Sequence, residues 1–222
     1  MTTQLAHRAT EDGAMRHAKA WRPTFSRAEV AFLIAVPLLW AVLLLFHPAP
    51  DKDDIYGSLR NDATAYLVVH LGTIAFIGLM GYALYLLVRG VPGTAARIAR
   101  MAIGPFVLFY AAGEAILGIA AGVLVQDAND SSEGPRSASA EAATTLWNNA
   151  ISADLLPAIG SVAWIVAALA TAVAYRRLAV PPAVPILIAV SSLVVLHAPP
   201  FGPFALVCFA AAVVLLARGR RG

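Results

Sequence analysis

The chain has 222 residues, of which 59% are hydrophobic and only 13% are charged. Soluble domains contain about 45–50% apolar and about 25% charged residues, so this composition excludes an ordinary soluble domain and favours a lipid environment. The formal charge is only +3, and the basic residues lie beside the apolar runs. Neither feature is typical of a nucleic-acid-binding surface. The single cysteine, Cys208, excludes a disulfide framework within one chain.

Alternating polar and apolar segments predict an all-α bundle of six transmembrane helices. Residues 1–28 are polar and basic, and we expect them to be disordered or to lie on the membrane surface. A transmembrane domain over residues 29–217 follows, with spans at 30–46, 63–88, 102–125, 155–175, 183–197 and 204–217. The last two spans are short and are joined by the proline-rich turn 198–203, which cannot continue a helix.

Loop charges predict the orientation of these spans. With the N-terminus inside, 13 of the 16 lysines and arginines fall on the cytoplasmic side, including the basic tail 218–222. The outer segments hold only Lys52, Arg60 and Arg136. Six spans therefore satisfy the positive-inside rule with both termini in the cytoplasm of a bacterial inner membrane. The Ser-, Ala- and Asn-rich segment 127–145 is expected to be an exposed outer loop.

Ionisable side chains inside the spans are the main functional signal, because each costs about 2.5–3.5 kcal/mol in the bilayer centre. Glu114 is predicted near the middle of the third span and His70 in the outer half of the second. His47, Asp154 and His197 are predicted at the outer ends of three other spans. Five helices thus direct polar groups toward the outer side, which predicts a polar cavity that opens outward.

The residues of this cavity predict acid–base chemistry. Glu114 is the expected general acid, Tyr110 lies one turn before it and is expected to bond its carboxyl, and His70 or Asp154 would accept a proton. Two alternatives stay open: Glu114 as a protonated group that joins two helices, and Asp154 as the N-cap of the fourth span.

Four further residues are expected to contact a substrate. Tyr66 shares a helix face with His70, Trp147 and Asn149 precede the fourth span, and His197 ends the fifth. His47 and His197 are equally explained as ordinary interfacial residues. Three histidines and two carboxylates could bind zinc, but no HxxxH or HExxH spacing occurs, so neither a metal nor a cofactor is predicted.

Three stretches resemble an uncharacterised family of bacterial multi-pass membrane proteins: residues 66–72, residues 105–114 and the hairpin 197–203. That resemblance implies no established activity. In architecture alone, the chain is also similar to small integral-membrane terpene cyclases, compact helical bundles in which buried carboxyl groups protonate an isoprenoid. Their motifs do not match this chain residue by residue.

These observations predict an integral membrane enzyme that acts on a lipophilic substrate by general acid–base catalysis, with an isoprenoid as one candidate. The expected partners are that small molecule and membrane lipid, with no nucleic acid. The alternatives are a small-solute or proton-coupled transporter, in which the same residues form a relay, and a non-catalytic accessory subunit. Neither the substrate nor the oligomeric state can be derived from the sequence.

Overall fold

The computed structural model describes residues 24–178 and 180–218, and all regular structure in these ranges is helical. No strand occurs among the described residues, which confirms the predicted all-α class. The expectations for the basic N-terminal segment up to residue 23 and for the tail beyond residue 218 lie outside the described ranges.

Five helices within the described ranges are long and apolar enough to cross a membrane. They are α2 (Arg27–Leu44), α4 (Ala63–Val88), the continuous helix Thr94–Asp130, the continuous helix Ala150–Arg176, and α11 (Phe201–Arg218). The third of these runs through α5 (Thr94–Pro105), η1 (Phe106–Tyr110), α6 (Ala111–Gly113), η2 (Glu114–Ala120) and α7 (Ala121–Asp130). The fourth joins η3 (Ala150–Leu155) to α9 (Leu156–Arg176). Each predicted span except the fifth therefore corresponds to a helix of spanning length.

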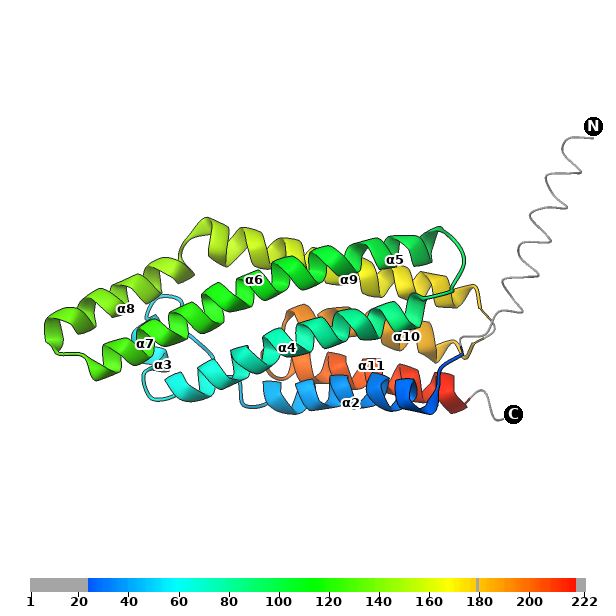
Figure 1. Cartoon of the computed structure of the whole chain (residues 1–222), viewed down its shortest axis with the longest axis horizontal. Coiled ribbons are helices and arrows are strands. Elements are labelled where there is room, and N and C mark those ends of the chain that lie inside the picture. The colour runs from blue at the N-terminus through cyan, green and yellow to red at the C-terminus, as the bar shows by residue number, and fades with distance from the viewer. Residues whose placement is uncertain (1–23, 179, 219–222) are drawn as a thin grey trace, which may run out of the picture.

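The long helices lie side by side along the long axis of the molecule (Figure 1). The beginning of α2, the end of α11 and the connections α4–α5 and α9–α10 are all at one end of the bundle. The short α3 (Ile55–Leu59) and the α7–α8 turn are at the opposite end. The chain therefore enters and leaves the bundle at the same end.

The predicted fifth span is shorter than expected. It consists of α10 (Ala183–Val190) followed by the 3-10 helix η4 (Ser191–Val195), which together rise about 22 Å, less than the hydrocarbon thickness of about 30 Å. Leu196 then leaves the helical region, and α11 begins at Phe201, directly after a cis Pro199–Pro200 bond. His197 consequently lies inside the bundle, whereas the sequence predicted it at the outer boundary.

The segment 127–145 is not a loop. Residues up to Asp130 extend α7, and α8 (Glu133–Trp147) forms a second helix that packs back against it. Alanine is the best helix former, and it recurs through α8, while Glu133 in the first turn favours the helix N-terminus. The arginine of this hairpin, Arg136, donates hydrogen bonds to the carbonyls of Ala128 and Ser131 near the end of α7.

A large apolar core fills the half of the bundle nearest the chain ends. Trp164 and Tyr175 are fully buried, and each donates a hydrogen bond to a backbone carbonyl of a neighbouring helix, at Ser191 and Leu87 respectively. Close packing of α9 on η1 requires Gly160, because a side chain there would overlap the backbone of Tyr110.

Candidate functional site

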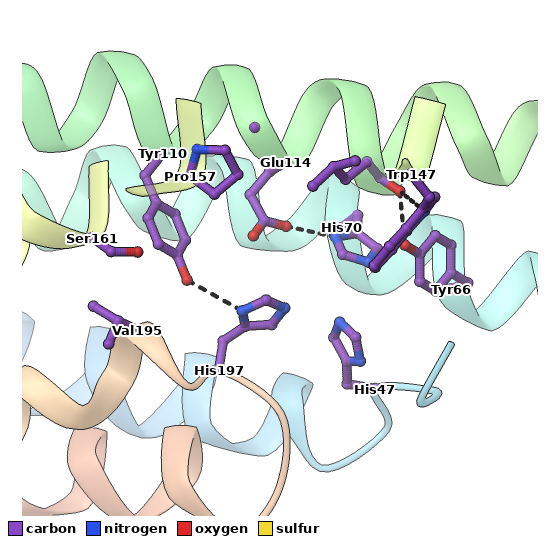
Figure 2. Close-up of a pocket in the computed structure, with 12 residues that line it drawn as sticks. His47, Tyr66, His70, Tyr110, Glu114, Trp147, Pro157, Ser161, Val195 and His197 are labelled. Atoms are coloured by element: carbon purple, nitrogen blue, oxygen red, sulfur yellow. Dashed lines mark hydrogen bonds and ion pairs between the residues drawn. The ribbon is translucent and has the colours of Figure 1, made fainter. Parts of the chain in front are cut away.

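Most of the predicted site residues surround one cavity of about 100 Å³. Figure 2 shows its lining side chains, which come from α4, the third long helix, α8, α9, η4 and the segments after α2 and η4. The lining residues are His47, Tyr66, His70, Tyr110, Gly113, Glu114, Leu117, Trp147, Pro157, Ser161, Val195 and His197. Six of the eight residues that the sequence singled out are in this list.

Glu114 and His70 form the centre of the site. Glu114 Oε2 lies 2.5 Å from His70 Nδ1, and the two residues are only 7% and 3% exposed. This confirms the prediction that they face the bundle interior within reach of one another. Gly118, one turn after Glu114, lies against the imidazole of His70, where a Cβ atom would overlap the ring. The absence of a side chain at position 118 therefore allows α4 and η2 to approach closely enough for the pair to form.

Two π-helical turns of the third long helix carry its polar site residues: η1 contains Tyr110 and η2 contains Glu114. Such turns are rare, and they often occur at functional sites because they change the direction of side chains and carbonyls. In η2, the carbonyl of Leu117 accepts hydrogen bonds from Tyr66 Oη at 2.7 Å and from Trp147 Nε1 at 3.1 Å. One carbonyl therefore joins α4 and α8 to the helix that carries Glu114.

Tyr110 contacts a different partner from the one predicted. Its hydroxyl lies 3.2 Å from His197 Nδ1, and no hydrogen bond between Tyr110 and Glu114 is found among the described residues. The expectation that Tyr110 orients the Glu114 carboxyl is therefore wrong. Helical spacing of four residues assumes 3.6 residues per turn, whereas the π-helical turns around Tyr110 contain more residues per turn.

His47 lines the cavity, whereas the sequence predicted it at the membrane boundary. It follows α2 by three residues, and its ring lies 4.9 Å from the ring of His70 and 4.8 Å from that of His197, measured between ring centroids. Its two ring nitrogens are buried and have no hydrogen-bond partner among the described residues. The signal available in the sequence was the presence of three histidines at the outer side of the spans.

The two histidines outside the helices are in an environment that disfavours charge. Burial lowers the pKa of His47 to about 4, and the neighbouring His197 and His70 act in the same direction. Burial also lowers the pKa of His197. Burial thus favours the neutral form of both imidazoles, in which each ring offers a lone pair to a ligand.

Asp154 and Asn149 lie apart from the cavity. Asp154 is exposed within η3, so it does not cap the fourth helix as one alternative proposed. The N-cap is Asn149, whose side chain accepts hydrogen bonds from the backbone N–H groups of Ile151 and Ser152. The helix begins earlier than predicted, which moves Asp154 into its first turns and gives the capping role to Asn149.

No protein-family model, curated protein or solved structure matches this chain. These comparisons neither support nor oppose the resemblance drawn from residues 66–72, 105–114 and 197–203. The class of protein is consequently defined by its own fold and site: an α-helical protein with five candidate membrane-spanning helices in its described part and a cavity lined by three histidines, Glu114 and aromatic side chains.

Proposed function

We propose that this protein is a multi-pass membrane enzyme that transfers protons to and from a lipophilic substrate, with Glu114 and His70 as its acid–base pair. The observation that carries the proposal is the 2.5 Å contact between Glu114 Oε2 and His70 Nδ1 in the wall of a cavity. A buried carboxyl and imidazole in contact can share one proton, and either group can exchange it with a bound molecule.

The proposed topology has six membrane segments and cytoplasmic termini, in a bacterial inner membrane. The distribution of 13 basic residues inside and three outside supports it, and so does the common position of the beginning of α2 and the end of α11 (Figure 1). In this topology the segment Ala183–Val195 reaches only part of the way across, and α11 returns to the cytoplasmic side. The cavity then lies in the outer half of the membrane.

Separate roles follow for the groups that line the cavity. His70 Nε2 is buried and unpartnered among the described residues, so it is the ring atom available to a molecule bound in the cavity, while the proton exchanged with the substrate is the one shared by His70 Nδ1 and Glu114. Glu114 fixes the orientation of the ring and stabilises its protonated form. Tyr110 fixes His197 in the same manner through Nδ1. Tyr66 and Trp147 close the cavity through their shared bond to Leu117.

The size of the cavity narrows the class of substrate. Sites that enclose a whole drug-sized ligand have volumes of about 300–1,000 Å³, whereas this cavity has about 100 Å³. It therefore fits the reactive end of an amphiphilic molecule, with the apolar remainder between the helices and the lipid. An isoprenoid whose reactive end enters the cavity meets this condition; complete enclosure of a long isoprenoid, as in a terpene cyclase, would require the helices to separate.

A proton-coupled carrier is the second candidate, but the core argues against it. A carrier needs polar groups on both sides of its binding site so that access can alternate. On the chain-end side of the site, large side chains such as Trp40, Trp164 and Tyr175 are buried between the helices. Glu114 and His70 are the buried ionisable residues of the described ranges other than Cys208 and the tyrosines, so no second buried carboxylate or imidazole continues a relay toward the chain ends, which favours chemistry over transport.

Comparison of lipid extracts tests the proposed function. Wild-type protein and the Glu114→Gln variant are produced at equal levels in a bacterial host, and chloroform–methanol extracts are compared by mass spectrometry. We expect wild-type protein to convert one lipid into another that the empty host does not form. Glu114→Gln should reduce this conversion by about 100-fold or more.

Glu141→Gln is the matched control, since it makes the same substitution at an exposed carboxylate of α8. It should behave as wild type does. An identical conversion by wild-type and Glu114→Gln protein, at equal levels in the membrane, would overturn the proposal.

A further inference from the structure

Three imidazole rings from separate parts of the chain meet at the cavity (Figure 2). His47 follows α2, His70 belongs to α4, and His197 follows η4. Their ring centroids are 4.9 Å apart for His47 and His70, 4.8 Å for His47 and His197, and 6.3 Å for His70 and His197. The rings meet edge to face, and this arrangement leaves polar ring atoms without hydrogen-bond partners.

Ring nitrogens without partners are concentrated at this point. The buried side-chain nitrogens and oxygens that lack a hydrogen-bond partner within the described ranges are His47 Nδ1, His47 Nε2 and His70 Nε2. Each such group costs about 1–3 kcal/mol when it is left unpaired, so a cluster of three requires an explanation. A ligand that accepts a lone pair from one nitrogen of each ring would satisfy His70 Nε2 and one of the two nitrogens of His47.

In His70 and His197, the Nδ1 atom makes a hydrogen bond, as one nitrogen usually does in a histidine that binds a metal through the other. A histidine that binds a metal through one nitrogen usually makes a hydrogen bond through the other, often to a carboxylate, which fixes the tautomer and the ring orientation. His70 Nδ1 is bound to the Glu114 carboxylate at 2.5 Å, and His197 Nδ1 lies 3.2 Å from the Tyr110 hydroxyl. In both residues the Nε2 atom remains for a ligand.

The ring separations are close to those of a three-histidine site. A metal–nitrogen bond of about 2.0–2.1 Å places each ring centroid about 3.2 Å from the metal, so ligand rings at 90–120° are about 4.5–5.5 Å apart. Two of the observed separations are in this range, and the third, at 6.3 Å, is too long by about 1 Å. No three His, Cys, Asp or Glu side chains in the described part of the chain already have metal-ligand spacing, so the rings must rotate to bind.

We propose that His47, His70 and His197 together bind one divalent transition metal ion of the zinc class, with Glu114 and Tyr110 as the residues that orient two of its ligands. Imidazole nitrogens select zinc, cobalt, nickel or copper, whereas magnesium and calcium require oxygen ligands. The fourth coordination position faces the cavity of about 100 Å³, which has room for water or for the polar end of a substrate. This site does not depend on the proposed acid–base function, because the positions of the three rings and their unpartnered nitrogens carry it.

Metal binding is tested on the full chain in detergent, purified without a metal-affinity step and treated with a chelator. Co²⁺ is the probe, because its visible absorption reports both binding and coordination geometry, and Zn²⁺ is then added as a competitor. We expect one Co²⁺ per chain with a tetrahedral spectrum that Zn²⁺ removes. Single variants His47→Ala and His197→Ala should each weaken binding by more than about 100-fold, and Glu114→Gln by about 10–100-fold, the usual effect of removing an orienting partner.

A double variant, His7→Ala with His17→Ala, is the matched control, because these are the other two histidines of the chain and lie outside the described residues. It should bind Co²⁺ as wild type does. A soluble, monodisperse His47→Ala protein that binds Co²⁺ with wild-type affinity would overturn the site, as would wild-type protein that binds no stoichiometric metal. These readouts need no substrate, so failure of the metal site and failure of the proposed function are distinguishable.

Discussion

Gly118 lies directly against the imidazole of His70, at the point where η2 crosses α4. A Cβ atom at position 118 would overlap Cβ, Cγ and Nδ1 of the histidine, which are atoms near the base of its side chain. His70 could not avoid them by a small rotation, because its Nδ1 is also the atom that contacts Glu114. The glycine is therefore part of the geometry that forms the buried pair.

Gly118→Ala should destabilise the protein and disrupt this pair. Overpacking of this kind costs about 1–3 kcal/mol, which exceeds the helix propensity that alanine gains over glycine. Gly104→Ala is the control on the same long helix, since no atom lies within 4 Å of a Cβ built there. Thermal unfolding in detergent should show a lower midpoint for Gly118→Ala and an unchanged or higher one for Gly104→Ala. Equal midpoints would contradict the close approach.

The shared acceptor at Leu117 gives a second prediction. Tyr66→Phe and Trp147→Phe each remove one hydrogen bond to this carbonyl, which costs about 0.5–1.5 kcal/mol, with an additional packing loss for the smaller ring at position 147. Removal of both should cost more than the sum, because the remaining donor can no longer compensate. The measurement is a double-variant cycle of unfolding free energies. Tyr82→Phe, at an exposed tyrosine, is the control, and strict additivity would show that the two donors act independently.

Topology is checked by thiol labelling in a Cys208→Ala background, which removes the one native cysteine. Ser137→Cys in α8 and Thr94→Cys at the beginning of α5 introduce exposed thiols at opposite ends of the bundle. If the termini are cytoplasmic, a membrane-impermeant maleimide should label position 137 in intact cells, and position 94 only after the membrane is opened. The reverse pattern would invert the topology and place the cavity in the inner half of the membrane.

The spanning helices could be predicted because lipid imposes length and apolarity directly on the sequence. The α8 helix could not, because its many small and polar residues give the same hydropathy as a loop, and only alanine's helix propensity distinguishes them. The early end of the segment Ala183–Val195 could not be predicted either, because an apolar run does not show where its helix changes to 3-10 geometry and stops.

The site was predicted in outline for a related reason. Ionisable residues are energetically costly inside a membrane, so Glu114 and His70 could be recognised within apolar spans. Their contact could be expected for the same reason. The partner of Tyr110 and the inward position of His47 depend on two π-helical turns and on the path of the segment after α2. Neither of these has a signature in residue spacing, because a helical wheel assumes a constant number of residues per turn.

Replacement of both partners by leucine distinguishes a functional pair from a structural one. Glu114→Leu or His70→Leu alone leaves a buried polar partner without its hydrogen bond, and each should lower the free energy of unfolding by about 1–3 kcal/mol. The double variant removes both polar groups and leaves apolar side chains in an apolar environment. It should recover most of the loss and be about as stable as wild type, since buried ionic pairs seldom exceed well-packed apolar residues in stability.

The same preparations should be assayed for conversion in lipid extracts and for Co²⁺ binding. We expect the double variant to unfold at the wild-type temperature while both of these activities are lost, which would mean that the pair is retained for chemistry and adds little to stability. His70→Leu with Glu141→Leu is the control combination, because Glu141 is exposed and makes no side-chain contact with His70; it should show no recovery. A double variant that is less stable than either single variant would instead make the pair a structural link between α4 and η2.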